Sequence, residues 1–311
     1  MENKIIALIV IIEVIAITWV IQNNWFILKS EVEKPSYNFS ENPPEFPPKW
    51  GDNPINYTQK FDGYVVKFPR VTTVHFNWDG IRDYDNVTIE KPNNTIRIIA
   101  LGDSHTFGWG VELEETWPKV LEKLLNEKNK DNNKTFQVIN FGLCSHGFKD
   151  YVNSLESKGL KYKPDIIIVG FHKDDLGSAH LWSEFAHNFS KNFSEVPKIA
   201  GEKYYKNLFE NFDYFWETNI LPKAKILNNL SSIYKFPVIM VFNINIGRLR
   251  IDDKYYNNLK NLTQKYEWEF IDVDPYLKDE KLENLILHPL DQHPSPLYYQ
   301  LIARAVYEKF R

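Results

Sequence analysis

A serine, a histidine and several carboxylates stand directly after apolar runs of this sequence. Ser104 follows the run Arg97 to Leu101, within Gly-Asp-Ser-His. If that run is a strand of a parallel sheet, its carboxyl end opens into the crevice where such sheets bind ligands. A serine hydroxyl there needs a base and an anion hole before it can attack an acyl carbon. The chemistry to look for is therefore acyl transfer.

The segment Asp291-Gln-His-Pro supplies a candidate base. His293 would take the Ser104 proton and return it, and Asp291 would fix the tautomer of His293 or stabilise its charged form. Other α/β sheets assemble such a Ser-His-Asp set from segments far apart in sequence. The structural alternative for Ser104 is a turn residue that caps a helix.

Three further histidines, His105, His146 and His172, stand in loops after predicted strands. Imidazoles and carboxylates that converge on one crevice could hold Zn²⁺ or another divalent ion. Loop histidines also serve as hydrogen-bond donors to a substrate, so the residues leave both roles open.

For three tryptophans and the one cysteine, we weigh a role in packing against a role in binding or catalysis. Trp109, Trp117 and Trp182 could stack on sugar rings near the site, but we favour packing as their more common role. We interpret Cys144 as a small buried residue rather than a thiolate nucleophile.

Short apolar runs alternate with helical patterns from Thr95 to the C-terminus. We predict strands over residues 97–101, 136–141, 164–171, 237–242 and 269–273. We predict helices over residues 117–126, 150–160, 219–234, 255–266 and 296–310. This alternation indicates an α/β fold, a three-layer α/β/α sandwich with a parallel sheet.

An apolar run from Ile5 to Ile21, interrupted once by Glu13, precedes this body. Its Ile, Leu and Val residues favour membrane insertion by about 0.5 kcal/mol each, which outweighs about 3 kcal/mol for one central carboxylate. No small-residue cleavage site follows, so we predict an uncleaved transmembrane signal anchor over residues 1–28. A proline-rich spacer over 29–56, a small β-rich preamble over 57–94 and a main domain over 95–311 complete the predicted organisation.

Glycosylation sequons of the form Asn-x-Ser/Thr exceed the two or three that this composition gives roughly by chance. They begin at Asn38, Asn56, Asn86, Asn93, Asn133, Asn188, Asn192, Asn229 and Asn261. The excess favours a body outside the cytoplasm, and an asparagine-rich composition with idle sequons is the alternative. The net charge of −4 and the absence of a basic block argue against nucleic acid as a partner.

Ordered blocks of the sequence resemble the SGNH, or GDSL-like, hydrolase family. They are Gly102-Asp103-Ser104 with Thr106-Phe107-Gly108, Asn140-Phe141-Gly142, Lys163-Pro164-Asp165, Asp174-Asp175 and Asp291-x-His293-Pro294. The likeness runs from about Asn77 to the C-terminus. It implies a flavodoxin-like fold, esterase or acyltransferase chemistry and no metal or other cofactor. It also implies an oxyanion hole formed by the serine N–H, a glycine N–H and an asparagine side chain.

The sequence departs from the family pattern in its second, third and last blocks. Ser145 stands where the glycine is expected, and Asp174 stands where the asparagine is expected. An ionised Asp174 only accepts hydrogen bonds, and losing one oxyanion donor typically costs about 10²–10³ in rate. One residue instead of two separates Asp291 from His293, which leaves a Ser-His dyad open. The full candidate oxyanion or substrate-binding set is Ser145, Asp174, Gly142, His105 and His172.

The expected function is that of a membrane-anchored, extracytoplasmic serine esterase that acts on small acyl esters, with O-acetylated cell-surface glycans as candidate substrates. Two alternatives stay open. The first is an O-acyltransferase on surface glycans, which shares the acyl-enzyme and differs in the acceptor. The second is a catalytically impaired glycan-binding module, which Ser145 and Asp174 favour.

Overall fold

The computed structural model describes residues 58–62, 71–130, 133–144, 146–177, 208, 210–242, 253–288 and 291–311. The predicted anchor and spacer lie outside these ranges, as do most of the residues between 176 and 215. Among the described helices, none combines the length and the hydropathy that a membrane span requires.

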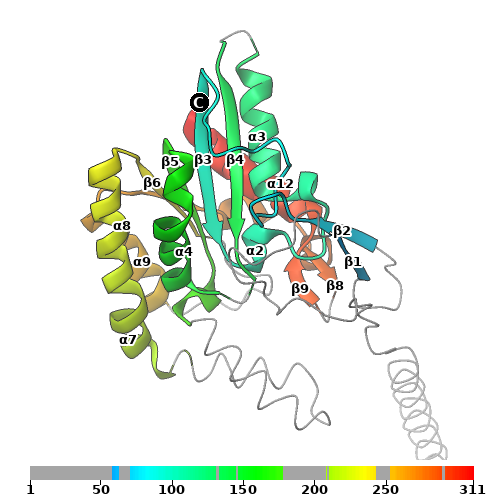
Figure 1. Ribbon diagram of the computed structural model, residues 1–311. Coiled ribbons are helices and arrows are strands. Elements are labelled where there is room, and N and C mark those ends of the chain that lie inside the picture. Colours follow the sequence, from blue (N-terminus) through cyan, green and yellow to red (C-terminus); the bar gives the residue numbers. More distant parts are fainter. Residues whose placement is uncertain are drawn as a thin grey trace, which may run out of the picture.

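Five parallel strands form the central sheet, in the spatial order β4-β3-β5-β6-β7 (Figure 1). Their bounds are β3 Thr95–Gly102, β4 Thr135–Gly142, β5 Ile166–Phe171, β6 Val238–Phe242 and β7 Glu269–Asp272. All five predicted strands are confirmed. Because β4 lies on one side of β3 and β5 on the other, the chain reverses its winding direction at β3. Open α/β sheets bind ligands at such a switch point, outside the carboxyl ends of the strands.

Helices cover both faces of the sheet, which gives three layers (Figure 1). On one face lie α4 (Phe148–Ser157), α8 (Leu221–Tyr234) and α9 (Asp253–Lys265). On the other lie α3 (Trp117–Lys128) and α12 (Pro296–Tyr307). The buried residues of β3 alternate between two cores: Ile99 and Leu101 belong to the first, and Ile98 and Ala100 to the second. This alternation explains why β3 is apolar from Ile98 to Leu101.

Helix ends differ from the predictions where local hydrogen bonds decide them. Helix α4 begins at Phe148, two residues before the predicted start, because the N–H of Gly147 donates to the Asp150 carboxylate at 3.2 Å. It ends at Ser157, and a 3₁₀ turn over Gly159–Tyr162 takes up the rest of the predicted helix. Helix α12 begins at Pro296 as predicted, after Ser295, whose side chain accepts from the N–H of Tyr298 at 3.3 Å, and it ends at Tyr307, three residues before the predicted end.

Short elements connect the layers. They are the antiparallel pair β1 (Thr58–Asp62) and β2 (Val71–His75), α2 (Ser104–Phe107), the 3₁₀ turns Leu113–Glu115, Lys173–Leu176 and Glu308–Phe310, α7 (Phe212–Phe215), a π turn over Trp216–Ile220, α10 (Asp274–Leu277), α11 (Leu282–Leu285), β8 (Ile286–His288) and β9 (Asp291–Pro294). Strands β8 and β9 pair antiparallel, in a segment where we predicted no strand.

The segment before β3 is built into the main body. Ile81 and Val87 belong to the first core, and Arg82 and Asp83 are buried. The Arg82 guanidinium donates to the backbone carbonyls of Phe107, Gly108 and Val111, in and after α2. The segment therefore shapes the loop that follows Ser104.

Candidate active site

Ser104 lies at the carboxyl end of β3, as the first residue of the single turn α2. Asp103 precedes it and caps this turn, because its side chain accepts from the N–H of His105 at 2.8 Å. Gly108 ends the turn in the left-handed conformation, with φ of 90°. Ser104 is partly exposed, so its hydroxyl is open to a ligand.

His293 meets Ser104 from the opposite end of the sequence. Its Nε2 lies 2.8 Å from the Ser104 Oγ, which is hydrogen-bond distance. The β8–β9 hairpin carries His293, and the N–H of Ser295 closes that hairpin on the carbonyl of Leu285 at 2.9 Å. Gly110 packs directly on this hairpin, since a Cβ there would lie 2.3 Å from the Leu287 side chain. Contact between the two loops thus holds the histidine at the serine.

Asp291, the predicted partner of His293, lies two residues before it on β9. Its side chain is outside the described part of the structure, as is the whole of Ser145. Asp174 lies in the 3₁₀ turn Lys173–Leu176 after β5, and its side chain is likewise not described. The roles of these three residues stay predictions.

Gly142 has a packing role that the sequence did not reveal. Its N–H donates to the Asn140 side-chain oxygen at 3.0 Å, and Asn140 Nδ2 donates to the Phe107 carbonyl at 3.2 Å. A Cβ on Gly142 would lie 2.1 Å from the backbone N of Phe107. Gly142 therefore allows α2 to lie against the end of β4, and its N–H is directed to Asn140.

His105 and His172 lie side by side, with ring centroids 3.9 Å apart. His172 Nδ1 is 3.7 Å from a carboxylate oxygen of Asp103, and all three residues are buried. The His105 ring is also 5.4 Å from the His293 ring, so this cluster adjoins the serine–histidine pair. His146 is separate from it and places its Nδ1 2.7 Å from the Cys144 carbonyl.

The tryptophans separate into two roles. Trp117 is 1% exposed and belongs to the second core, as the packing interpretation predicted. Trp109 is partly exposed, and its ring centroid lies 5.9 Å from that of His293. Trp182 lies outside the described residues. Cys144 is buried, and burial raises the pKa of its thiol well above the usual value, which disfavours a thiolate nucleophile.

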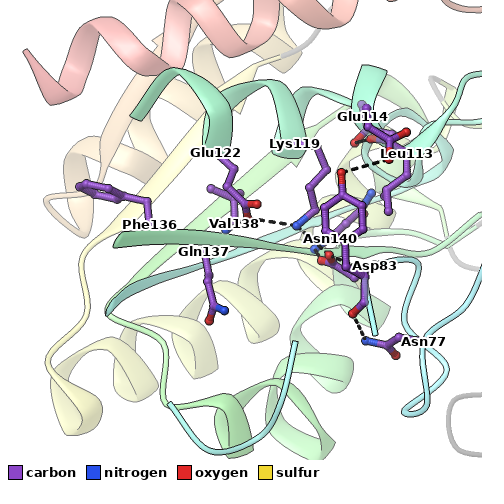
Figure 2. A network of polar contacts seen from close by, with 12 residues as sticks. Asn77, Asp83, Leu113, Glu114, Lys119, Glu122, Phe136, Gln137, Val138 and Asn140 are labelled. Atoms are coloured by element: carbon purple, nitrogen blue, oxygen red, sulfur yellow. Dashed lines mark hydrogen bonds and ion pairs between the residues drawn. The ribbon is translucent and has the colours of Figure 1, made fainter. Parts of the chain in front are cut away.

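An ionic network joins the segment before β3 to α3 and β4 (Figure 2). Asp83 accepts from the backbone N–H of Asn140 at 2.9 Å and from Lys119 Nζ at 2.7 Å. Lys119 also contacts Glu122, at 3.1 Å. Burial lowers the pKa of Lys119, but Asp83 and Glu122 more than offset this and hold it above its usual value. Sequence reasoning missed this network because charged residues are rarely buried.

The sheet order and the site together define an α/β/α protein with a serine–histidine pair in hydrogen-bond distance at the switch point of its parallel sheet. The model of the GDSL-like Lipase/Acylhydrolase family matches residues 100–301, more than half of the chain. The chain therefore belongs to this family, also known as the SGNH hydrolases, as its sequence blocks indicated. No curated protein matches the chain.

Solved structures with a similar fold include several esterases. A two-domain esterase (CEX) active on acetylated mannans is 16% identical over 70% of this chain, with a TM-score of 0.46. The present chain covers 49% of that protein, about half its length. A putative lipolytic protein of the G-D-S-L family from Desulfitobacterium hafniense is 18% identical over 68% of this chain and 98% of its own, with a TM-score of 0.42. A catalytic mutant of Axe2, an acetylxylan esterase from Geobacillus stearothermophilus, is 17% identical over 68% of this chain and 93% of its own, with a TM-score of 0.44.

Proposed function

We propose that this protein is a serine esterase that hydrolyses small acyl esters by a Ser-His-Asp mechanism. The observation that carries the proposal is the 2.8 Å distance between Ser104 Oγ and His293 Nε2 at the switch point of the sheet. A serine hydroxyl at this distance can pass its proton to the imidazole while it attacks an acyl carbon.

The other steps follow from the neighbouring residues. Protonated His293 would return the proton to the leaving alcohol, and water activated by His293 would then release the acyl group from Ser104. Asp291 and His293 are two residues apart on β9, and residues two apart on a strand share a face. We therefore assign Asp291 the stabilisation of the His293 imidazolium. As the first residue of α2, Ser104 has a backbone N–H that no intrahelical acceptor takes, which suits an oxyanion donor.

We propose O-acetylated glycans as the substrate class. Trp109 supports this, because a partly exposed indole 5.9 Å from the His293 ring offers a flat apolar surface for a sugar ring beside the reacting serine. The predicted anchor over residues 1–28 and the excess of sequons favour a body held at the outer side of a membrane. An acyl ester on a cell-surface glycan would be within reach of such a body.

The test uses the full-length chain in detergent. Wild type should react with a fluorophosphonate probe and release acetate from 4-nitrophenyl acetate and from an acetylated xylo-oligosaccharide. Ser104→Ala should lose probe labelling, and His293→Ala should lower kcat by about 10³–10⁴. His146→Ala serves as the control, since His146 bonds to the Cys144 carbonyl and not to Ser104. Labelling that persists in Ser104→Ala would refute the assignment.

The two alternatives are an O-acyltransferase and a catalytically impaired glycan-binding module, and each predicts a different experimental result. A glycan acceptor that raises the turnover of 4-nitrophenyl acetate and becomes acetylated would identify a transferase. The impaired module is favoured by Asp174, an acid in place of the family asparagine. It would be supported if wild type neither labels nor hydrolyses while wild type and Ser104→Ala bind the acetylated oligosaccharide equally.

A further inference from the structure

Two imidazoles and a carboxylate come together beside the reacting pair. The ligand atoms that Asp103, His105 and His172 offer all lie within 4.8 Å of one another. The three residues are only 4%, 8% and 6% exposed. Asp103 and His105 flank Ser104 after β3, and His172 follows β5. Because β3 and β5 are adjacent, with Leu101 paired to Val169, the sheet itself brings these residues together.

Hydrogen bonds to the backbone fix the position of each residue. The Asp103 side chain accepts from the N–H of His105, which orders the turn around Ser104. The N–H of His172 donates to the Asp175 carboxylate at 2.7 Å, and the His172 carbonyl accepts from the Tyr255 hydroxyl at 2.7 Å. These bonds order the backbone from which the three side chains extend.

The kinds of side chain in the cluster also favour a cation. The two imidazole rings lie with centroids 3.9 Å apart, and each offers a nitrogen to the same small space. Asp103 adds a carboxylate beside them. Neutral imidazole and ionised carboxylate are the forms in which these side chains bind metal.

We propose that Asp103, His105 and His172 form a binding site for a divalent transition metal, with Zn²⁺ as the preferred ion. Two nitrogens and one oxygen suit Zn²⁺, whereas Mg²⁺ and Ca²⁺ prefer oxygen ligands. Tetrahedral Zn²⁺ places its ligands about 3.4 Å apart, so ligand atoms that lie within 4.8 Å of one another need to close by up to about 1.4 Å. Three protein ligands leave a fourth position for water or substrate, the arrangement of catalytic zinc sites.

The site goes beyond the proposed esterase reaction. The resemblance to the family implies no metal, and the Ser104–His293 pair works without one. A metal here would add positive charge next to that pair, because the His105 ring is 5.4 Å from the His293 ring. The positive charge of the metal would stabilise the negative charge that develops on a substrate oxygen near Ser104 during the reaction.

Direct metal binding tests the proposal without any substrate. The full-length chain in detergent is stripped with a chelator, dialysed and titrated with Co²⁺, followed by visible absorption, and with Zn²⁺ in competition with a chromophoric chelator. Wild type should bind one equivalent of either ion, with the intense bands of four- or five-coordinate Co²⁺. His172→Gln and His105→Gln should each weaken Zn²⁺ binding by at least about 100-fold. His146→Gln, a loop histidine outside the cluster, should bind as wild type does.

Two results would overturn the site: no stoichiometric binding by wild type, or unchanged affinity in both His105→Gln and His172→Gln. Should these variants fail to fold, X-ray absorption of the Zn²⁺-loaded wild type decides. It should show two imidazole ligands at about 2.0 Å, and none or one would refute the assignment. Since the readout is binding, a failure of the esterase assays leaves this result unaffected.

Discussion

Asp174 is the residue at which this sequence departs most from the family pattern. The asparagine expected there would donate a hydrogen bond to the oxyanion, and an ionised aspartate cannot. We expect Asp174→Asn to raise kcat for 4-nitrophenyl acetate by about 10²-fold, with a smaller change in KM, because the gain occurs in the transition state. Steady-state kinetics measure this.

A matched control is Asp213→Asn, an aspartate with a 74% exposed side chain that pairs with Lys254 away from the site. It should leave kcat unchanged. An Asp174→Asn enzyme that is slower than wild type would show that the carboxylate itself contributes to the reaction.

The Gly142→Ala variant tests how tightly the turn that carries Ser104 packs against β4. The missing Cβ of Gly142 would lie 2.1 Å from the backbone N of Phe107, and backbone atoms cannot move aside as a flexible side chain can. Gly142→Ala should therefore lower the free energy of unfolding by about 3 kcal/mol, the cost of severe overpacking. Thermal or denaturant unfolding measures the loss.

Gly159→Ala is the comparison, because the Cβ there would meet side-chain atoms of Leu155, Ile99 and Phe141, at 2.9, 3.3 and 3.5 Å, and no backbone atom is among these three nearest. Its cost should be well below that of Gly142→Ala. Equal costs would argue that the contact with Phe107 does not limit packing.

At the scale of elements, the ionic network around Lys119 joins the segment before β3 to α3 and β4 (Figure 2). Lys119 is 3% exposed and Asp83 is fully buried. Lys119→Met keeps the length of the side chain but leaves the Asp83 carboxylate buried without its cation. Breaking a buried pair in this way typically costs about 3–5 kcal/mol, and we expect a loss of that size in urea unfolding.

The surface pair of Lys309 with Glu269 gives the control, since both side chains are nearly half exposed. Lys309→Met should change the free energy of unfolding by no more than about 1 kcal/mol. A Lys119→Met protein as stable as Lys309→Met would mean that the network contributes little to holding β4 in place.

At the scale of the whole molecule, we predict that the anchor over residues 1–28 holds the candidate active site at a membrane. We expect the full chain to stay in the membrane pellet after an alkaline carbonate wash and a chain without residues 1–28 to move to the supernatant. The apolar run from Ile5 to Ile21 gives the reason, because its transfer into lipid outweighs the cost of Glu13. A full chain released by carbonate would contradict the anchor.

Glycan mapping by mass spectrometry on native material tests on which side of the membrane the body of the protein lies. The described sequon asparagines, Asn86, Asn93, Asn133, Asn229 and Asn261, are all exposed, as modification requires. We expect glycans on at least some of the sequons. Bare asparagines throughout would remove the support for an extracytoplasmic body.

The sequence by itself determined the five strands, because a strand buried on both faces must be apolar along its length. It also determined Ser104 and His293 as candidates, since a serine after a strand and a histidine near the C-terminus belong to specific sequence blocks. From the residues alone, the roles of His105 and His172 stayed open.

Only the tertiary structure decided which of these residues meet. The β8–β9 hairpin that positions His293 has strands of 3 and 4 residues, too short to show a period in sequence. Asp83 and Lys119 are of residue types that are usually exposed, and only the fold buries them together. His105 and His172 become neighbours only because β3 and β5 are adjacent, and strand order depends on the crossover connections and on how the helices cover the sheet, which no local pattern records.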